Sequence, residues 1–328
     1  MKPSSLIKIF EKVVEPILLY NCEITQAFLP SKWSYIDFKD NIWKNENQIN
    51  QVIRSFLRQI LGVGKKTSTW VITTETGKYP IVLKVYIQIM KYWIRLLNIE
   101  SKYMQESQII HAKLWKSNKS SWCKIIEYLL KYTNLEKGFN IKDVIERPNS
   151  FLDKFRRNIF KNYLDYWKKE QSSISNTKLD FYKSIKKHFS FERYLDILKK
   201  EYRTPITRLR LSNHNFPIEI LRYKKNKKDQ NIGREDRKCQ ICDLDEIGNE
   251  IHYLAKCNNT KIVDLRNIFI RNLKYLQPQF EHFNDLNIIK YCINMNDEII
   301  LEPFSTFVKD VFEIYKEEEQ ERLDIFGK

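Results

Sequence analysis

The sequence predicts a mainly α-helical protein built from helical bundle-like domains, with a small Cys/His-rich subdomain near the C-terminus. Apolar residues recur at intervals of three and four over long stretches, as they do on the buried face of a helix. Only 7 of the 328 residues are glycine, and alternating β-branched patterns are few, which disfavours a large sheet. No internal repeat is evident, and the length predicts about two domains.

The first 20 residues predict an interrupted helix. Ser4 or Ser5 is placed to cap a helix that opens at Leu6, because a serine hydroxyl can accept a hydrogen bond from an unpaired amide of the first turn. Pro16 lacks an amide hydrogen and is expected to kink or end this helix.

Two longer amphipathic helices follow. Between residues 49 and 60 the apolar residues lie on one face, and Gly62 can end that helix in the left-handed conformation. Residues 81–97 predict a second amphipathic helix, with Pro80 in its first turn, where a missing amide hydrogen breaks no hydrogen bond.

The middle of the chain predicts a helix with a basic outer face. Ser150 is expected to cap it, and aromatic and aliphatic side chains as far as Trp167 are expected to face inward. The outward positions are basic: Lys154, Arg156, Arg157 and Lys161.

Residues 170–176 are polar and predict a linker. Helices are expected near residues 179–189 and 191–202. Thr204 and Pro205 then predict the cap and first-turn proline of a short helix. The tail is expected to alternate helix and turn and to end in an acidic helix face.

The net charge of +16 is concentrated in one region, since residues 151–230 hold 21 Lys and Arg against 9 Asp and Glu. Such a surface favours a polyanion, which releases counterions on binding. Aromatic side chains lie among the cations and could stack bases: Tyr163, Tyr166, Trp167, Phe189, Tyr202 and Tyr223. The alternative is a solvated, lysine-rich face of amphipathic helices.

Just after this region, Cys239, Cys242, His252 and Cys257 stand in the order C-x2-C-x9-H-x4-C. Three thiolates and one imidazole can complete a tetrahedron around Zn²⁺, which predicts a structural zinc knuckle without an open position for water. The alternative is a set of buried cysteines that pack as small apolar residues. The polar residues around the first pair disfavour that alternative.

The remaining cysteines, Cys22, Cys123 and Cys292, lie outside any ligand spacing and are expected to be ordinary buried thiols. Nowhere do eighteen apolar residues run unbroken, so no membrane partner is expected. The N-terminus lacks the continuous apolar core of a signal peptide, which favours an intracellular location.

Two groups of segments resemble non-LTR (LINE-type) retrotransposon reverse transcriptase proteins. Residues 13–23, 56–63 and 74–80 resemble the thumb-like region just after the polymerase domain of that family. Residues 208–214, 218–223, 237–242 and 250–257 resemble its C-terminal CCHC zinc-knuckle segment. The resemblance covers roughly residues 1 to 270 and is weaker in the middle.

The resemblance implies a C-terminal region that grips element RNA or target DNA during target-primed reverse transcription, beside an upstream polymerase portion, in the nucleus and in cytoplasmic ribonucleoprotein. Together with the apolar periodicity and the charge distribution, it predicts a thumb-like helical region (1–100), a basic helical region (101–203), a zinc-knuckle region (204–270) and a helical tail (271–328). Beyond the zinc ligands, the nucleic-acid-binding residues expected are Arg208, Arg210, Arg222, Lys224, Lys225, Lys227, Lys228, Arg237 and Lys238.

The sequence departs from the family in its catalytic residues. A polymerase needs paired aspartates to hold two metal ions, and no Tyr-x-Asp-Asp or Phe-x-Asp-Asp occurs. The chain is therefore expected not to be an enzyme. A zinc-stapled helical protein-interaction module is the main alternative. A restriction-like endonuclease is less favoured, because neither Pro278 nor Pro303 is followed by an acidic residue.

Overall fold

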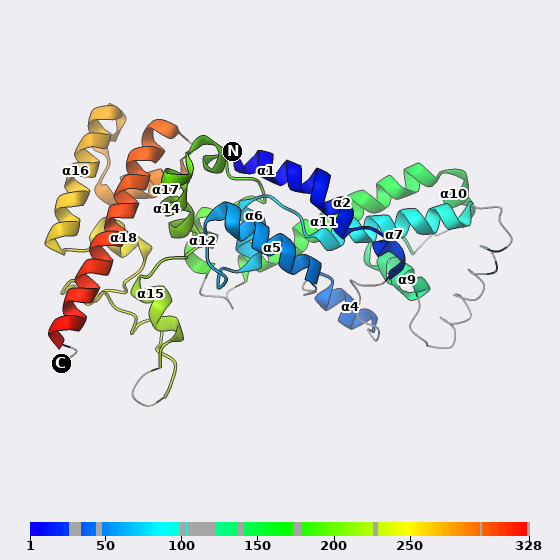
Figure 1. The fold of residues 1–328 in the computed structure, drawn as a ribbon, viewed down its shortest axis with the longest axis horizontal. Coiled ribbons are helices and arrows are strands. Elements are labelled where there is room, and N and C mark those ends of the chain that lie inside the picture. Colours follow the sequence, from blue (N-terminus) through cyan, green and yellow to red (C-terminus); the bar gives the residue numbers. More distant parts are fainter. Residues whose placement is uncertain are drawn as a thin grey trace. The chain divides into compact units, whose positions relative to one another are not determined.

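A computed structural model describes most of the chain, namely residues 1–25, 34–43, 48–98, 103, 106, 122–136, 141–173, 179–225, 229–295 and 297–326. Within these residues the fold is mainly α-helical, as the sequence predicts (Figure 1), and strand pairing is confined to three isolated bridges. No helix among them is long and apolar enough to cross a membrane.

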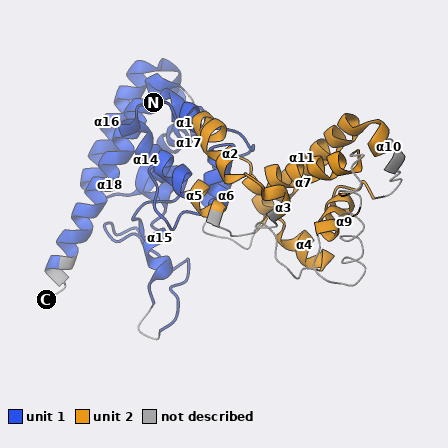
Figure 2. Ribbon diagram, turned by 45° about the vertical axis from the view of Figure 1, so that its right-hand side comes forward, with its two compact units in different colours: residues 1–6, 55–77, 174–328 blue, residues 7–54, 78–173 orange. Residues whose placement is uncertain are grey.

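The chain forms two compact units (Figure 2). Unit 1 comprises residues 1–6, 55–77 and 174–328, and unit 2 comprises residues 7–54 and 78–173. Each unit therefore joins segments that are distant in the sequence. The division into four regions expected from the sequence stays a prediction.

Unit 2 is a helical assembly in which α7 packs against α3, α9 and α11. Its core includes Phe38, Tyr86 and Ile159, which are almost fully buried. Unit 2 contains all or part of α1 (Pro3–Ile9), η1 (Phe10–Val14), α2 (Glu15–Leu18), α3 (Cys22–Thr25), α4 (Tyr35–Asn41), α5 (Gln48–Leu61), α7 (Ile81–Leu97), α9 (Trp122–Tyr132), α10 (Ile141–Glu146) and α11 (Pro148–Ser172).

Unit 1 contains α18 packed against α14 and α16, with α18 and α16 side by side (Figure 1). Phe269 and Phe307 stack in this interface, with ring centroids 4.6 Å apart. Besides the start of α1 and the end of α5, the elements of unit 1 are α6 (Thr69–Glu75), α12 (Asp180–Ile185), α13 (Tyr194–Ile197), α14 (Lys200–Arg210), α15 (Pro217–Ile220), η3 (Leu221–Tyr223), η4 (His252–Lys256), α16 (Thr260–Leu276), η5 (Pro278–His282), α17 (Asp285–Asn294) and α18 (Glu298–Phe326).

Three of the long predicted helices are confirmed. Helix α5 ends at Leu61, and Gly62 follows with φ of +67°. Helix α7 covers residues 81–97, although Pro80 is its N-cap and not part of its first turn. Helix α11 buries Phe155, Ile159 and Trp167, while the four basic residues predicted to face outward are exposed.

The predicted starts of two helices are wrong, because prolines and not serines mark them. Helix α1 begins at Pro3 and α11 at Pro148, so Ser4, Ser5 and Ser150 lie inside helices. A proline suits the first helical position, where the amide hydrogen would be unpaired in any case.

Pro16 does not end the helical run, because it lies in the first turn of α2 directly after the π-helix η1. The alternative, a kink at Pro16, stays a prediction. The helix start predicted at Thr204 and Pro205 is wrong. Pro205 lies inside α14, where packing of that helix against α18 outweighs one lost backbone hydrogen bond. Helix α11 extends to Ser172, so it occupies the start of the expected linker, and residues 174–178 lie outside the described residues.

Candidate metal centre and basic surface

Cys239 and Cys242 lie on a tight hairpin-like loop. Lys238 and Ile247 form an antiparallel bridge, and the Cys239 amide donates to the carbonyl of Glu246 at 2.8 Å. The chain turns back through Asp245, which adopts the left-handed conformation at φ +54°. Two cysteines three residues apart thereby share one side of a short loop.

His252 and Cys257 are brought together by the π-helix η4. The Cys257 amide donates to the His252 carbonyl at 2.7 Å, closing a π-turn of six residues. Because this turn is wider than an α-turn, residues five apart lie nearer the same side of the helix. The Asn249 side chain accepts a hydrogen bond from the His252 amide at 2.8 Å and so fixes the start of the turn.

The ligand atoms of Cys239, Cys242, His252 and Cys257 all lie within 4.8 Å of one another. His252 and Cys257 are buried, while the other two cysteines are half-buried. The set predicted from the spacing is therefore brought together, and a single metal ion could bridge the four donor atoms.

The outer partners of the cluster orient the imidazole. His252 Nε2 lies 3.4 Å from Cys242 Sγ, and His252 Nδ1 lies 3.2 Å from a carboxylate oxygen of Glu246. The same carboxylate contacts Lys256 Nζ at 3.2 Å. A carboxylate on the far ring nitrogen is the arrangement that directs the other nitrogen toward a metal.

Backbone amides contact all three cysteine sulfur atoms. The amides of Ile241, Leu244 and Asn259 donate to the sulfur atoms of Cys239, Cys242 and Cys257, each two residues earlier. These hydrogen bonds favour the deprotonated sulfur, which is the form that binds a metal.

The pKa values of the three cysteines shift in different directions. A hydrogen bond from Cys257, together with those from His252 and Tyr253, lowers the pKa of Cys239 to about 3 despite its burial. The hydrogen bond to Cys239 raises the pKa of Cys257, and burial raises the pKa of Cys242. A metal ion that binds all three as thiolates must therefore displace protons.

Helix α16 of unit 1 holds the cluster from outside. Asn259 caps α16 by accepting from the Ile262 amide, and its side-chain nitrogen donates to the Ile241 carbonyl at 3.2 Å. Arg266, on α16, donates to the Cys257 carbonyl at 2.7 Å. The loop is therefore fixed to the helical core.

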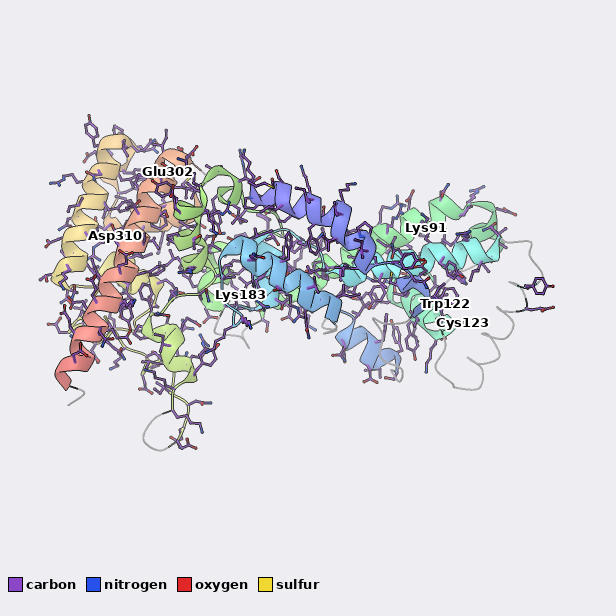
Figure 3. The ribbon with its side chains drawn as sticks, viewed as in Figure 1. Lys91, Trp122, Cys123, Lys183, Glu302 and Asp310 are labelled. Carbon is purple, nitrogen blue, oxygen red and sulfur yellow. The ribbon has the colours of Figure 1, made fainter. Side chains whose placement is uncertain are left out.

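The remaining cysteines lie outside the cluster. Burial raises the pKa of Cys22 and of Cys292 to about 12, as expected for buried thiols. Cys123 is only half-buried and follows Trp122 on α9 (Figure 3).

Several of the predicted nucleic-acid-binding residues are exposed in unit 1. Arg208 is exposed, and its Nε donates to the Gly62 carbonyl at 3.2 Å. Lys224 and Lys225 are exposed, and Lys225 lies 2.7 Å from Asp229. Lys238 is half-exposed and pairs with Asp245.

Two of the predicted arginines are buried, which corrects the expectation that they face a nucleic acid. Arg237 donates to the carbonyls of Ile232 and Ile218, and Arg210 pairs with Glu75. Arg222 is largely covered and pairs with Glu219 at 3.0 Å. Lys227 and Lys228, also predicted to bind, lie outside the described residues.

The partner of Arg210 belongs to a buried polar cluster that the sequence reading missed. The fully buried carboxylate of Glu75 accepts hydrogen bonds from Arg210 Nε at 2.7 Å, from the Tyr194 hydroxyl at 2.8 Å and from the Tyr182 hydroxyl at 2.9 Å. Burial alone would raise the pKa of Glu75, but the Arg210 guanidinium and the nearby Lys186 outweigh burial and hold that pKa below its ordinary value.

Comparison with protein-family models, with curated proteins and with solved structures finds no match for this chain.

Proposed function

We propose that this chain is a non-catalytic nucleic-acid-binding protein in which a structural zinc ion fixes a basic surface. The observation that carries the proposal is the placement, in one compact unit, of four convergent sulfur and nitrogen donors together with exposed cations. The resemblance to the C-terminal region of non-LTR retrotransposon reverse transcriptases points in the same direction.

The donor set favours zinc. Thiolates and imidazole are soft or borderline ligands, which suit Zn²⁺ and disfavour Mg²⁺ or Ca²⁺. Cys239, Cys242 and Cys257 would bind as thiolates and His252 through Nε2. Four protein ligands complete a tetrahedron, so this zinc would supply structural stability and not an activated water.

The cations favour a polyanionic partner. Arg208, Lys224 and Lys225 are exposed in the unit that carries the donor cluster. A phosphate chain bound along such a surface releases counterions, which drives binding without reading a base sequence. RNA and DNA are both candidate partners. A grip on element RNA or target DNA, beside an upstream polymerase portion in nuclear or cytoplasmic ribonucleoprotein, is carried over from the resemblance.

The test is the binding of fluorescently labelled single-stranded RNA and DNA at two salt concentrations. Because each displaced phosphate counterion adds to the salt dependence, the affinity is expected to fall on the order of tenfold or more between about 50 mM and about 200 mM salt. No binding of either strand at the lower salt concentration would reject the proposal.

A pair of double variants locates the surface. Lys224→Gln with Lys225→Gln is expected to weaken binding equally for all sequences. Arg271→Gln with Lys290→Gln is the matched control, since these exposed cations lie on α16 and α17, outside the basic segment. Equal losses in the two double variants would indicate that charge alone, and not this surface, holds the nucleic acid.

A further inference from the structure

Unit 1 contains a cavity of about 400 Å³ between the turn that follows α14 and the face of α18. Its lining includes Arg208 from α14, Asn213 to Phe216 from the turn, and Lys309, Phe312 and Lys316 from α18. A cavity of this size falls within the range of small-molecule sites.

Aromatic rings line the cavity. The centroid of the half-buried Phe312 ring lies 5.9 Å from that of His214 and 5.3 Å from that of Phe216. His214 is held in place, because its Nδ1 accepts from the Phe216 amide and its Nε2 donates to Glu250 at 3.1 Å. The half-buried Phe312 ring therefore presents an aromatic face to a ligand, and the buried His214 and Phe216 rings support it from behind.

Charged and amide groups line the rest of the cavity. Arg208, Lys309 and Lys316 are exposed cations, and the Nε contact of Arg208 with Gly62 fixes the direction of its side chain. Asn213 and Asn215 add amide groups, and the carboxylates of Glu201 and Glu313 also line the cavity. Cations suit phosphate oxygens, whereas carboxylates and amides can bond the amino groups on the edge of a base.

The aromatic lining continues to the metal cluster. Phe216 stacks on Tyr253 with ring centroids 4.2 Å apart and planes 21° apart. The Tyr253 hydroxyl in turn lies 3.2 Å from Cys239 Sγ. Phe216 and Tyr253 therefore connect the lining of the cavity to the Cys/His cluster.

From this arrangement we infer that the cavity takes one unstacked base of a single-stranded nucleic acid. The base stacks on Phe312, and Arg208 and Lys316 contact its phosphates. This inference deepens the proposed function and rests on it, because it names a place where a base, and not only the phosphate chain, is bound.

The decisive variant is Phe312→Leu, which keeps an apolar side chain of similar size but removes the ring. Affinity for a labelled single-stranded oligonucleotide is expected to fall about tenfold, since one base stacked on one aromatic ring contributes about that much. Tyr275→Leu is the matched control, because Tyr275 is exposed on α16 and does not line the cavity. The control is expected to bind like the wild-type protein.

Two further measurements separate this inference from the proposed function. An oligonucleotide of abasic sites keeps the phosphates but has no base, so it is expected to bind wild type and Phe312→Leu equally and weakly. A nucleoside 5′-monophosphate, followed by NMR, is expected to shift the amide resonances of residues 213–216 in wild type and not in Phe312→Leu.

Salt-sensitive binding that is indifferent to base removal and to Phe312→Leu would overturn the inference and leave the proposed function standing. Monophosphate binding at residues 213–216 without oligonucleotide binding would support the cavity and reject the proposed function. Absence of both would overturn both.

Discussion

Unit 1 holds two buried polar clusters that differ in how far apart their members lie in the sequence. The Cys/His cluster draws its four residues from a span that begins at Cys239 and ends at Cys257. The second cluster joins Glu75 on α6 to Tyr182, Tyr194 and Arg210 on α12, α13 and α14. The first brings together soft donor atoms that could hold a metal ion, whereas the second neutralises a carboxylate with a guanidinium.

This difference shows that a single sequence reveals clusters of closely spaced residues more readily than contacts between distant residues. A metal cluster has a spacing rule, because both cysteines lie on one tight turn and the histidine and last cysteine on another. A buried ion pair has no such rule, since its partners can lie anywhere in the chain. Glu75 and Arg210 both fall in segments that carry the family resemblance, and the structure gives them a packing role.

The largest expected effect comes from removing a metal ligand. Structural zinc contributes on the order of 10 kcal/mol to the folding of a small site. Cys257→Ser is therefore expected to release the ion and to unfold residues 237–259 locally, while unit 2 stays folded. Metal content by mass spectrometry and local hydrogen exchange measure the two effects.

Cys123→Ser serves as the control, because Cys123 is half-buried on α9 and outside the cluster. Retention of one metal ion per chain in Cys257→Ser would contradict the assignment of Cys257 as a ligand.

The next largest effect is expected at Arg210. Arg210→Met leaves the Glu75 carboxylate buried without its main cation, which is expected to cost about 3 to 5 kcal/mol in the free energy of unfolding. Denaturant unfolding of the full chain measures this loss. A double variant that also carries Glu75→Gln is expected to recover part of it, because the buried carboxylate that lost its main cation is then neutral. If the double variant were as unstable as Arg210→Met, the pairing would not be the source of the loss.

The acid dependence of stability distinguishes the ion pair from simple packing. The folded pKa of Glu75 lies below its unfolded value, so this group stabilises the fold above the unfolded pKa. That contribution is lost as the pH falls through the folded pKa. Unit 1 is thus expected to lose stability progressively below about pH 4.5, near the ordinary value of a glutamate.

In Arg210→Met, burial is expected to raise the folded pKa of Glu75 above its unfolded value. The contribution of Glu75 to the free energy of unfolding then changes with pH in the opposite direction. Acidification toward about pH 5 should therefore stabilise the variant relative to neutral pH. Parallel pH profiles for the two proteins would contradict the role given to Arg210.

Much of the fold and the cluster followed from local patterns. The apolar periodicity of residues 49–60 and 81–97 predicted α5 and α7, since each helix buries one face. Spacing alone named the four cluster residues. Burial of Arg210 and Arg237 could not be predicted, because an arginine in a basic segment looks the same whether it meets solvent or a distant carboxylate. The prediction that Pro205 begins a helix was wrong for the same reason, because the packing of α14 against α18 involves residues distant in the sequence.

The smallest expected effect lies outside the ligand set, at Glu246. Its carboxylate holds His252 Nδ1 at 3.2 Å, and Glu246→Gln weakens that hold by removing the charge. Metal affinity is expected to fall by about 10- to 100-fold, as for other partners of metal-bound histidines, while the ligands stay in place. Competition with a chromophoric chelator measures this affinity.

Asp245→Asn provides a matched control for Glu246→Gln, because it removes the same charge one residue earlier, from a side chain that pairs with Lys238 and is largely exposed. If both substitutions lowered the metal affinity equally, the loss would come from the net charge of the loop. A loss confined to Glu246→Gln would assign it to the hydrogen bond that turns the imidazole toward the three sulfur atoms.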